Sequence, residues 1–184
     1  MKSFVAICSM GLMLSACQFV SAADLKSGLQ VDDYAPAFNV TDVTGPQAGK
    51  KLCYRCQYGD RPVVSVFVRK MDENTAKLVK QLDELVAKHE DKKMAAFVTV
   101  LTGDPDAEET ELKKLAKDQK IAHTPLTVFE NAVGPTKYKI DENASVTVMM
   151  WVDSNVKVNH AFKAGELTDA SIAKVIEDTA KILN

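Results

Sequence analysis

The sequence predicts an α/β fold, a three-layer sandwich in which a central mixed β-sheet is flanked by helices. Residues 63–68 and 94–101 are continuous apolar runs of strand length, which is typical of parallel strands covered on both faces. Between them, residues 72–89 carry apolar side chains at the three- and four-residue spacing of an amphipathic helix. Strand, helix and strand together form a βαβ unit, which is the core of the predicted sheet.

The remaining elements follow from the same two periodicities and from turn residues. Residues 35–43 alternate apolar and polar side chains like a half-buried strand, and Lys51 with Leu52 could form a short returning strand. The later elements are a helix over 107–119, a strand over 126–129, a turn or single helical turn over 131–138, a hairpin of 146–152 with 156–162, and a helix over 168–183 that Thr168 or Asp169 can cap.

The N-terminus has the features of an export signal. Lys2 is followed by an apolar run over residues 4–14, which is too short to span a bilayer and is typical of a signal peptide. Two cleavage sites compete: residues 14–17 resemble a bacterial lipoprotein box that ends at the lipidated Cys17, and residues 20–22 resemble an ordinary signal-peptidase site. We therefore expect a periplasmic or extracellular protein, held at a membrane only if Cys17 carries a lipid anchor.

Length and charge bound the domain organisation and the partners. We expect a signal peptide over 1–22, a tether over 23–34 and one domain over 35–184, because this length buries enough surface for a single core. The formal net charge is −2 and no long basic run occurs, so nucleic-acid binding has no support. A soluble enzyme or binding module remains, whose partner would be an exported protein thiol or an envelope protein.

The only two cysteines beyond the signal region, Cys53 and Cys56, form a Cys-x-x-Cys pair directly before the apolar run 63–68. An exported pair of this kind is expected to be oxidised to a disulfide. Zinc would need about four ligands, and the three histidines lie far away without metal-ligand spacing, so we expect no metal and no other cofactor.

The sequence leaves the role of this cysteine pair open between redox activity and a structural crosslink, with metal binding as the least favoured alternative. Redox activity is favoured by the neighbouring cations Lys50, Lys51, Arg55 and Arg61, because positive charge stabilises the reactive thiolate. A structural crosslink is the alternative, although closing so small a ring constrains the unfolded chain by only about 2 kcal/mol.

The order of these elements resembles that of the thioredoxin-like superfamily, in its exported redoxin and peroxiredoxin-like branch. The resemblance covers about residues 36–183 and is carried by the segments 38–45 (FNVTDVTG), 59–64 (GDRPVV) and 152–156 (VDSNV). It implies the thioredoxin-like version of the predicted sandwich, and thiol-disulfide exchange as the activity to be considered.

The chain departs from the family pattern at two positions. Family members place their Cys-x-x-Cys just after the central strand, where this chain has residues 69–72 (RKMD), and the peroxiredoxin pattern of Pro, Thr and Cys is also missing. The family's cis-proline, which lies before the penultimate strand, would fall near Thr147, where no proline is available. The resemblance therefore implies a branch without the usual active-site cysteines.

Any redox site is then relocated to the opposite end of the sheet. By analogy with other Cys-x-x-Cys pairs, Cys53 would be the nucleophile, Cys56 the resolving cysteine and Arg55 a supporting cation. The alternative is a redox-inactive thioredoxin-like module that binds another envelope protein and has a structural Cys53–Cys56 disulfide.

Overall fold

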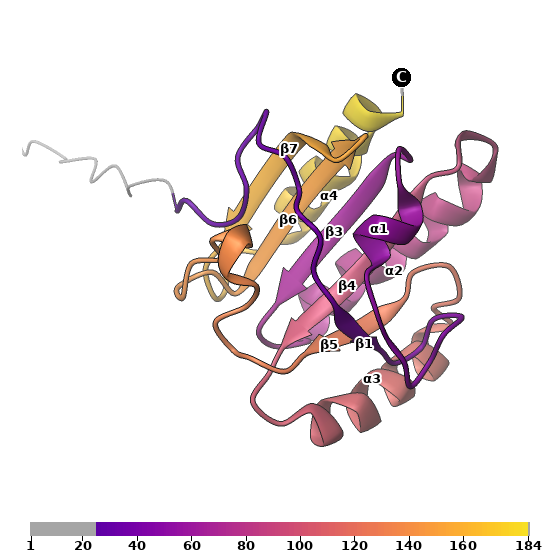
Figure 1. Ribbon diagram of the computed structural model, residues 1–184, viewed down its shortest axis with the longest axis vertical. Helices are drawn as coiled ribbons and strands as arrows, with labels where there is room; N and C mark the ends of the chain where they lie inside the picture. The colour runs from indigo at the N-terminus through magenta and orange to yellow at the C-terminus, as the bar shows by residue number, and fades with distance from the viewer. Residues whose placement is uncertain (1–24, 184) are drawn as a thin grey trace, which may run out of the picture.

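The computed structural model describes residues 25–183, which form a seven-stranded mixed sheet in the order β2-β1-β5-β4-β3-β6-β7 with helices packed against it (Figure 1). The strands are β1 (Val40–Asp42), β2 (Lys51–Leu52), β3 (Val63–Val68), β4 (Ala95–Leu101), β5 (Leu126–Phe129), β6 (Val146–Val152) and β7 (Asn155–Phe162). The helices are α1 (Tyr54–Tyr58), α2 (Glu73–Lys88), α3 (Pro105–Gln119) and α4 (Asp169–Asp178), with 3₁₀ turns η1 (Glu90–Lys92), η2 (Thr136–Tyr138) and η3 (Thr179–Ile182).

The predicted α/β fold with a central mixed sheet is confirmed. Strand β3 is parallel to β4, β4 is parallel to β5, and β6 lies antiparallel on the other side of β3. All residues of β3 and β4 are buried, as their continuous apolar sequences predict. The predicted signal peptide and Cys17 lie outside the described residues, and no helix within 25–183 is both long and apolar enough to cross a membrane.

One face of the sheet packs against the three long helices. Alternate residues of the central strands, such as Val66 and Val98, form a cluster with Leu82 of α2, Leu112 of α3 and Val175 of α4. Helix α2 begins where the sequence predicts, because the carboxylate of its N-cap residue Asp72 accepts a hydrogen bond from the amide of Thr75 at 2.8 Å.

The opposite face is covered by α1, η2 and the N-terminal segment, which crosses in front of the strands in Figure 1. Its core is aromatic: the Phe38 ring lies 5.5 Å from that of Phe67 and 4.7 Å from that of Tyr138, and Phe97 lies 6.2 Å from Trp151. This aromatic face is the surface on which the cysteine-bearing helix α1 rests.

The segment predicted as a tether packs against the sheet from Ser27 onward. Ser27 and Leu29 are buried, and the Ser27 hydroxyl is 2.6 Å from the Thr147 hydroxyl. The side-chain amide of Asn159 donates to the carbonyl oxygens of Ser27 and Leu29. Gly28 has φ +80, and a β-carbon at this position would lie only 2.8 Å from the Thr147 methyl group, so a glycine is required here. These residues therefore belong to the folded unit.

Candidate functional site

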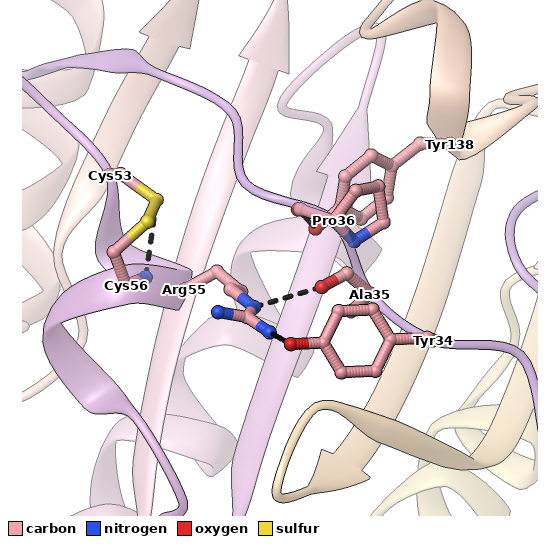
Figure 2. The surroundings of a disulfide bond; sticks show 7 residues. All are labelled: Tyr34, Ala35, Pro36, Cys53, Arg55, Cys56 and Tyr138. Carbon is pink, nitrogen blue, oxygen red and sulfur yellow. Dashed lines mark hydrogen bonds between the residues drawn. A yellow bond between two sulfur atoms is a disulfide. The ribbon is translucent and has the colours of Figure 1, made fainter.

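Cys53 and Cys56 are joined in a disulfide at the start of helix α1 (Figure 2). The two sulfur atoms are 2.10 Å apart. The two Cα atoms are 5.2 Å apart, within the usual range for protein disulfides. Cys56 is exposed to solvent and Cys53 is partly exposed, so the bond is open to a reductant or to a partner thiol.

Cys53 is the N-cap residue of α1. Its backbone is extended, and its sulfur accepts a hydrogen bond from the Cys56 amide at 3.1 Å. The helix ends after five residues at Gly59, which takes φ 59, a conformation that glycine adopts without steric cost. The Cys-x-x-Cys segment therefore lies in one turn of helix with the sulfur of Cys53 facing a backbone donor.

Tyr54, between the two cysteines, anchors this turn in the aromatic face. Only 2% of its surface is exposed, and its ring stacks on Phe97 at 5.6 Å. Its hydroxyl donates to the Asp42 carboxylate at 2.8 Å, while that carboxylate also accepts the amides of Gly45 and Gln47. Burial raises the pKa of Tyr54 far above its usual range, and the bond to Asp42 raises it further, so the phenol stays neutral.

Arg55, predicted to support the thiolate, points away from the sulfur atoms in Figure 2. Its Nε donates to the carbonyl oxygen of Ala35 at 2.8 Å, and a terminal guanidinium nitrogen contacts the hydroxyl of Tyr34. No hydrogen bond links Arg55 to either cysteine sulfur within residues 25–183. Its proposed effect on the thiolate is therefore limited to charge at longer range and stays a prediction.

Two of the other nearby cations also have partners elsewhere. Lys51 pairs with the Glu130 carboxylate at 2.9 Å. Arg61 donates to the backbone oxygens of Lys93 and Met94 at 2.6 and 3.1 Å. The hydrogen bond to the Cys53 sulfur comes instead from the backbone amide of Cys56. The residue types alone did not indicate this contact.

Helix α1, which carries the disulfide, lies on the face of the sheet over the first half of β3 and β4. Helix α1 rests on the first residues of β4, since Tyr54 stacks on Phe97 and the Tyr58 hydroxyl approaches the Ala96 oxygen at 3.5 Å. Residues 69–72 follow the other end of β3, where Arg69 donates to the Ala144 oxygen at 3.0 Å. A strand of this length separates the two ends by about 17 Å.

No protein-family model matches this sequence, and no curated protein matches it. Solved structures do. A proposed protein disulfide isomerase from Bacteroides thetaiotaomicron aligns with a TM-score of 0.65 and 15% identity, over 86% of this chain and 94% of that one. The chain has a thioredoxin-like fold.

Solved peroxiredoxin structures match this fold with a similar TM-score and a similar sequence identity. Peroxidoxin BcpB from Mycobacterium tuberculosis aligns with a TM-score of 0.60 and 16% identity, over 85% of this chain and 99% of that one. A yeast mitochondrial 1-Cys peroxiredoxin aligns with a TM-score of 0.60 and 13% identity, over 83% of this chain and 75% of that one. At such identities the likeness establishes the thioredoxin-like fold alone, and the site must be argued from its own residues.

Proposed function

We propose that this protein is an exported thiol-disulfide oxidoreductase that acts through Cys53 and Cys56 on the thiols or disulfides of other exported proteins. One observation carries the proposal: the disulfide is open to solvent, and the sulfur of Cys53 accepts the amide hydrogen of Cys56. The Cys-x-x-Cys spacing and the thioredoxin-like fold support it.

The amide contact favours the reactive form of Cys53. A hydrogen bond donated to a sulfur stabilises the thiolate more than the thiol, and the thiolate is the nucleophile in disulfide exchange. When the pair is reduced, the Cys56 amide is already placed to hold the Cys53 thiolate without rearrangement of α1. This supports Cys53 as the attacking residue.

The exchange then takes two steps. The Cys53 thiolate attacks a substrate disulfide, so that a bond forms between Cys53 and one substrate sulfur while the other substrate sulfur leaves as a thiolate. The Cys56 thiolate next attacks the Cys53 sulfur and releases the second substrate thiolate. Two electrons pass from the cysteine pair to the substrate, and the reverse sequence oxidises a substrate dithiol. The reduction potentials of the two couples set the direction.

The position of the pair supports a relocated site. Residues 69–72, at the opposite end of β3, contain no cysteine, so we infer that exchange does not use the position just after the central strand. A lipid anchor at Cys17 would keep this domain at a membrane surface, where envelope proteins are its partners.

A redox-inactive binding module is the second candidate. It is favoured by the two residues between the cysteines, because Tyr54 is fixed in the core and Arg55 is tied to the Ala35 oxygen. In that case the disulfide only closes the first turn of α1, and a partner binds elsewhere on the surface. Replacement of both cysteines by serine would then leave the fold and the partner binding intact.

Reduction of insulin by dithiothreitol, followed by turbidity, separates the two candidates. The oxidoreductase accelerates precipitation, and Cys53→Ser abolishes the acceleration. Gln57→Ala, which alters a neighbour in the same helix, is the matched control and should keep the wild-type rate. Equal rates for wild type and Cys53→Ser, with both proteins folded by circular dichroism, would reject catalysis by this pair.

A further inference from the structure

Two of the three large apolar side chains that are exposed within residues 25–183 lie in the N-terminal segment, residues 27–39. Val31 is 54% exposed and Tyr34 is 61% exposed, while the third, Val133, lies in the loop after β5. Single exposed apolar residues are common on protein surfaces, so the surroundings of each one decide whether it has a role.

The exposed ring of Tyr34 is held in place by Arg55, one of the two residues between the cysteines. The guanidinium carbon of Arg55 lies 4.8 Å from the centroid of the ring, and a terminal guanidinium nitrogen contacts the Tyr34 hydroxyl. The Nε of the same side chain donates to the carbonyl oxygen of Ala35 at 2.8 Å. Figure 2 shows the Arg55 side chain extending from the turn that carries the cysteines to Tyr34. The exposed ring is therefore linked directly to that turn.

The backbone that carries the ring is also fixed. Tyr34 forms a β-bridge with Asn155 at the start of β7, and the Ala35 amide donates to the Ser154 oxygen at 2.8 Å. An aromatic side chain that is ordered before a partner arrives has little conformational freedom left to lose on binding. Tyrosine and arginine are also the residue types on which binding energy at protein interfaces is concentrated. The pair of Tyr34 and Arg55 therefore has the properties of a preformed contact surface.

The charges near this surface disfavour an acidic partner. Asp32 and Asp33 precede Tyr34 in the chain. Asp153 and Asp60 meet at the neighbouring hairpin, where the Asp153 amide donates to the Asp60 oxygen at 3.2 Å. Against these carboxylates stands the single guanidinium that holds the ring. A segment that covers the ring should therefore carry an apolar side chain and no carboxylate beside it.

We propose that Tyr34 is a substrate-recognition residue of the Cys53–Cys56 site, and that the substrate is an extended segment of an exported polypeptide with an apolar side chain near its cysteine. This inference rests on the proposed exchange at this pair. Two to four residues of extended chain span about 7–13 Å, so a side chain at that separation from the substrate cysteine can reach past Arg55 to the ring. Folded proteins bury most of their apolar side chains, so such segments are accessible mainly in incompletely folded chains. Tyr34 therefore selects incompletely folded polypeptides.

The test follows the single-turnover reaction of the pre-reduced full chain with two unstructured peptides. Each peptide has one central cysteine, blocked as a mixed disulfide with 5-thio-2-nitrobenzoate. The peptides differ only at the two positions three residues from the cysteine, which carry leucine in one peptide and serine in the other. The absorbance of the released thiolate yields a dissociation constant and a limiting rate constant. The leucine peptide should bind about fivefold more tightly than the serine peptide, with a similar limiting rate constant.

Three variants connect this preference to the ring. Tyr34→Ser should bring the ratio of the two dissociation constants close to one, whereas Tyr34→Phe keeps the ring and should retain most of the preference. Arg55→Gln should lower the ratio, because the ring loses its stacked partner. Any effect of this cation on the reactivity of the thiolate applies to both peptides and cancels in the ratio.

Val133→Ser is the matched control. Val133 is the third exposed apolar side chain, and it follows Ala132, whose oxygen accepts a hydrogen bond from Arg69 at the opposite end of β3. The control should keep the wild-type preference. Equal binding of both peptides by the wild type, full preference in Tyr34→Ser, or an equal loss in Val133→Ser would each overturn the role of Tyr34.

A second titration separates this inference from the exchange reaction. Oxidised protein is mixed with the leucine peptide in which serine replaces cysteine, and amide chemical shifts are recorded. A saturable shift at Tyr34 and Arg55, in a protein whose reduced form reacts with neither blocked peptide, would reject the proposed exchange and keep the binding surface. Exchange without such a shift would overturn the role of Tyr34 alone, and the absence of both would overturn both proposals.

Discussion

The hydroxyl of Tyr54 donates a hydrogen bond to the Asp42 carboxylate at 2.8 Å, and this contact joins the residue between the two cysteines to strand β1. Asp42 is fully buried, and its other donors are the amides of Gly45 and Gln47. The orientation of the disulfide is therefore set by a buried charged group on a neighbouring strand.

Tyr54→Phe removes one donor from this buried carboxylate. We expect the free energy of unfolding to fall by about 1–3 kcal/mol, because a buried charged acceptor is left partly unsatisfied. Urea denaturation measures the change. Tyr58→Phe is the matched control and should cost less, since the Tyr58 hydroxyl makes only a 3.5 Å contact with the Ala96 oxygen. A Tyr54→Phe protein as stable as the wild type would show that this contact does not fix α1.

Reduction of the disulfide should cost little stability. The ring closed by Cys53 and Cys56 is short, so its loss should lower the free energy of unfolding by about 2 kcal/mol or less. Circular dichroism and urea denaturation with and without dithiothreitol test this. Unfolding on reduction would contradict it and would identify the disulfide as a structural requirement.

His160 should make the stability depend on pH. Burial lowers the pKa of His160 below its usual value, against the opposing effect of the Asp178 carboxylate 3.1 Å away, and the nearby charges of Lys181 and Lys174 lower it further. The unfolded chain then binds a proton more readily than the folded protein. The stability from His160 is therefore present above about pH 6.5 and is lost as the pH falls below it.

The Asp178 carboxyl affects the stability at lower pH than His160 does. Burial raises the pKa of its carboxyl, but the hydrogen bonds from Lys181 and Lys174 outweigh this and leave it lowered. Its contribution is lost only as the pH falls below the usual aspartate range. Between pH 7 and 5.5, the free energy of unfolding of His160→Gln should therefore fall less with decreasing pH than that of the wild type. The difference between the two slopes is at most about 1.4 kcal/mol per pH unit, the limit for one proton. Identical urea midpoints against pH for variant and wild type would contradict this.

The strands and long helices could be predicted because their patterns are local. Strands β3 and β4 are buried on both faces, so their sequences are continuously apolar, and α2 has both a regular apolar stripe and the N-cap residue Asp72. The pairing of β6 with β7 follows from two alternating segments around a short turn. Each of these signals is contained within about twenty residues of sequence.

The rest depends on contacts between distant parts of the chain. Helix α1 has five residues and is too short to show a helical period, and its Tyr54 is fixed by Asp42 on another strand. Ser27 appears in a polar segment, but hydrogen bonding to Thr147 lets it be buried. The stacking of Arg55 on the exposed Tyr34 ring can be recognised only when the arrangement of these residues in three dimensions is known.

The order of attack can be tested by trapping. In Cys56→Ser the resolving thiol is missing, so Cys53 should accumulate a mixed disulfide with glutathione after treatment with oxidised glutathione, because its thiolate keeps a backbone donor at residue 56. Mass spectrometry of the intact protein measures the adduct. Faster adduct formation in Cys53→Ser than in Cys56→Ser would reverse the two roles, as the greater exposure of Cys56 could allow.

The reduction potential of the Cys53–Cys56 pair tests the central claim most directly. Equilibration with mixtures of oxidised and reduced dithiothreitol, followed by thiol alkylation and mass spectrometry, yields this potential. Exchange activity predicts a value above about −300 mV with both sulfurs reached by the reductant. A lower potential, or sulfurs that resist reduction in the folded protein, would leave the disulfide as a structural crosslink.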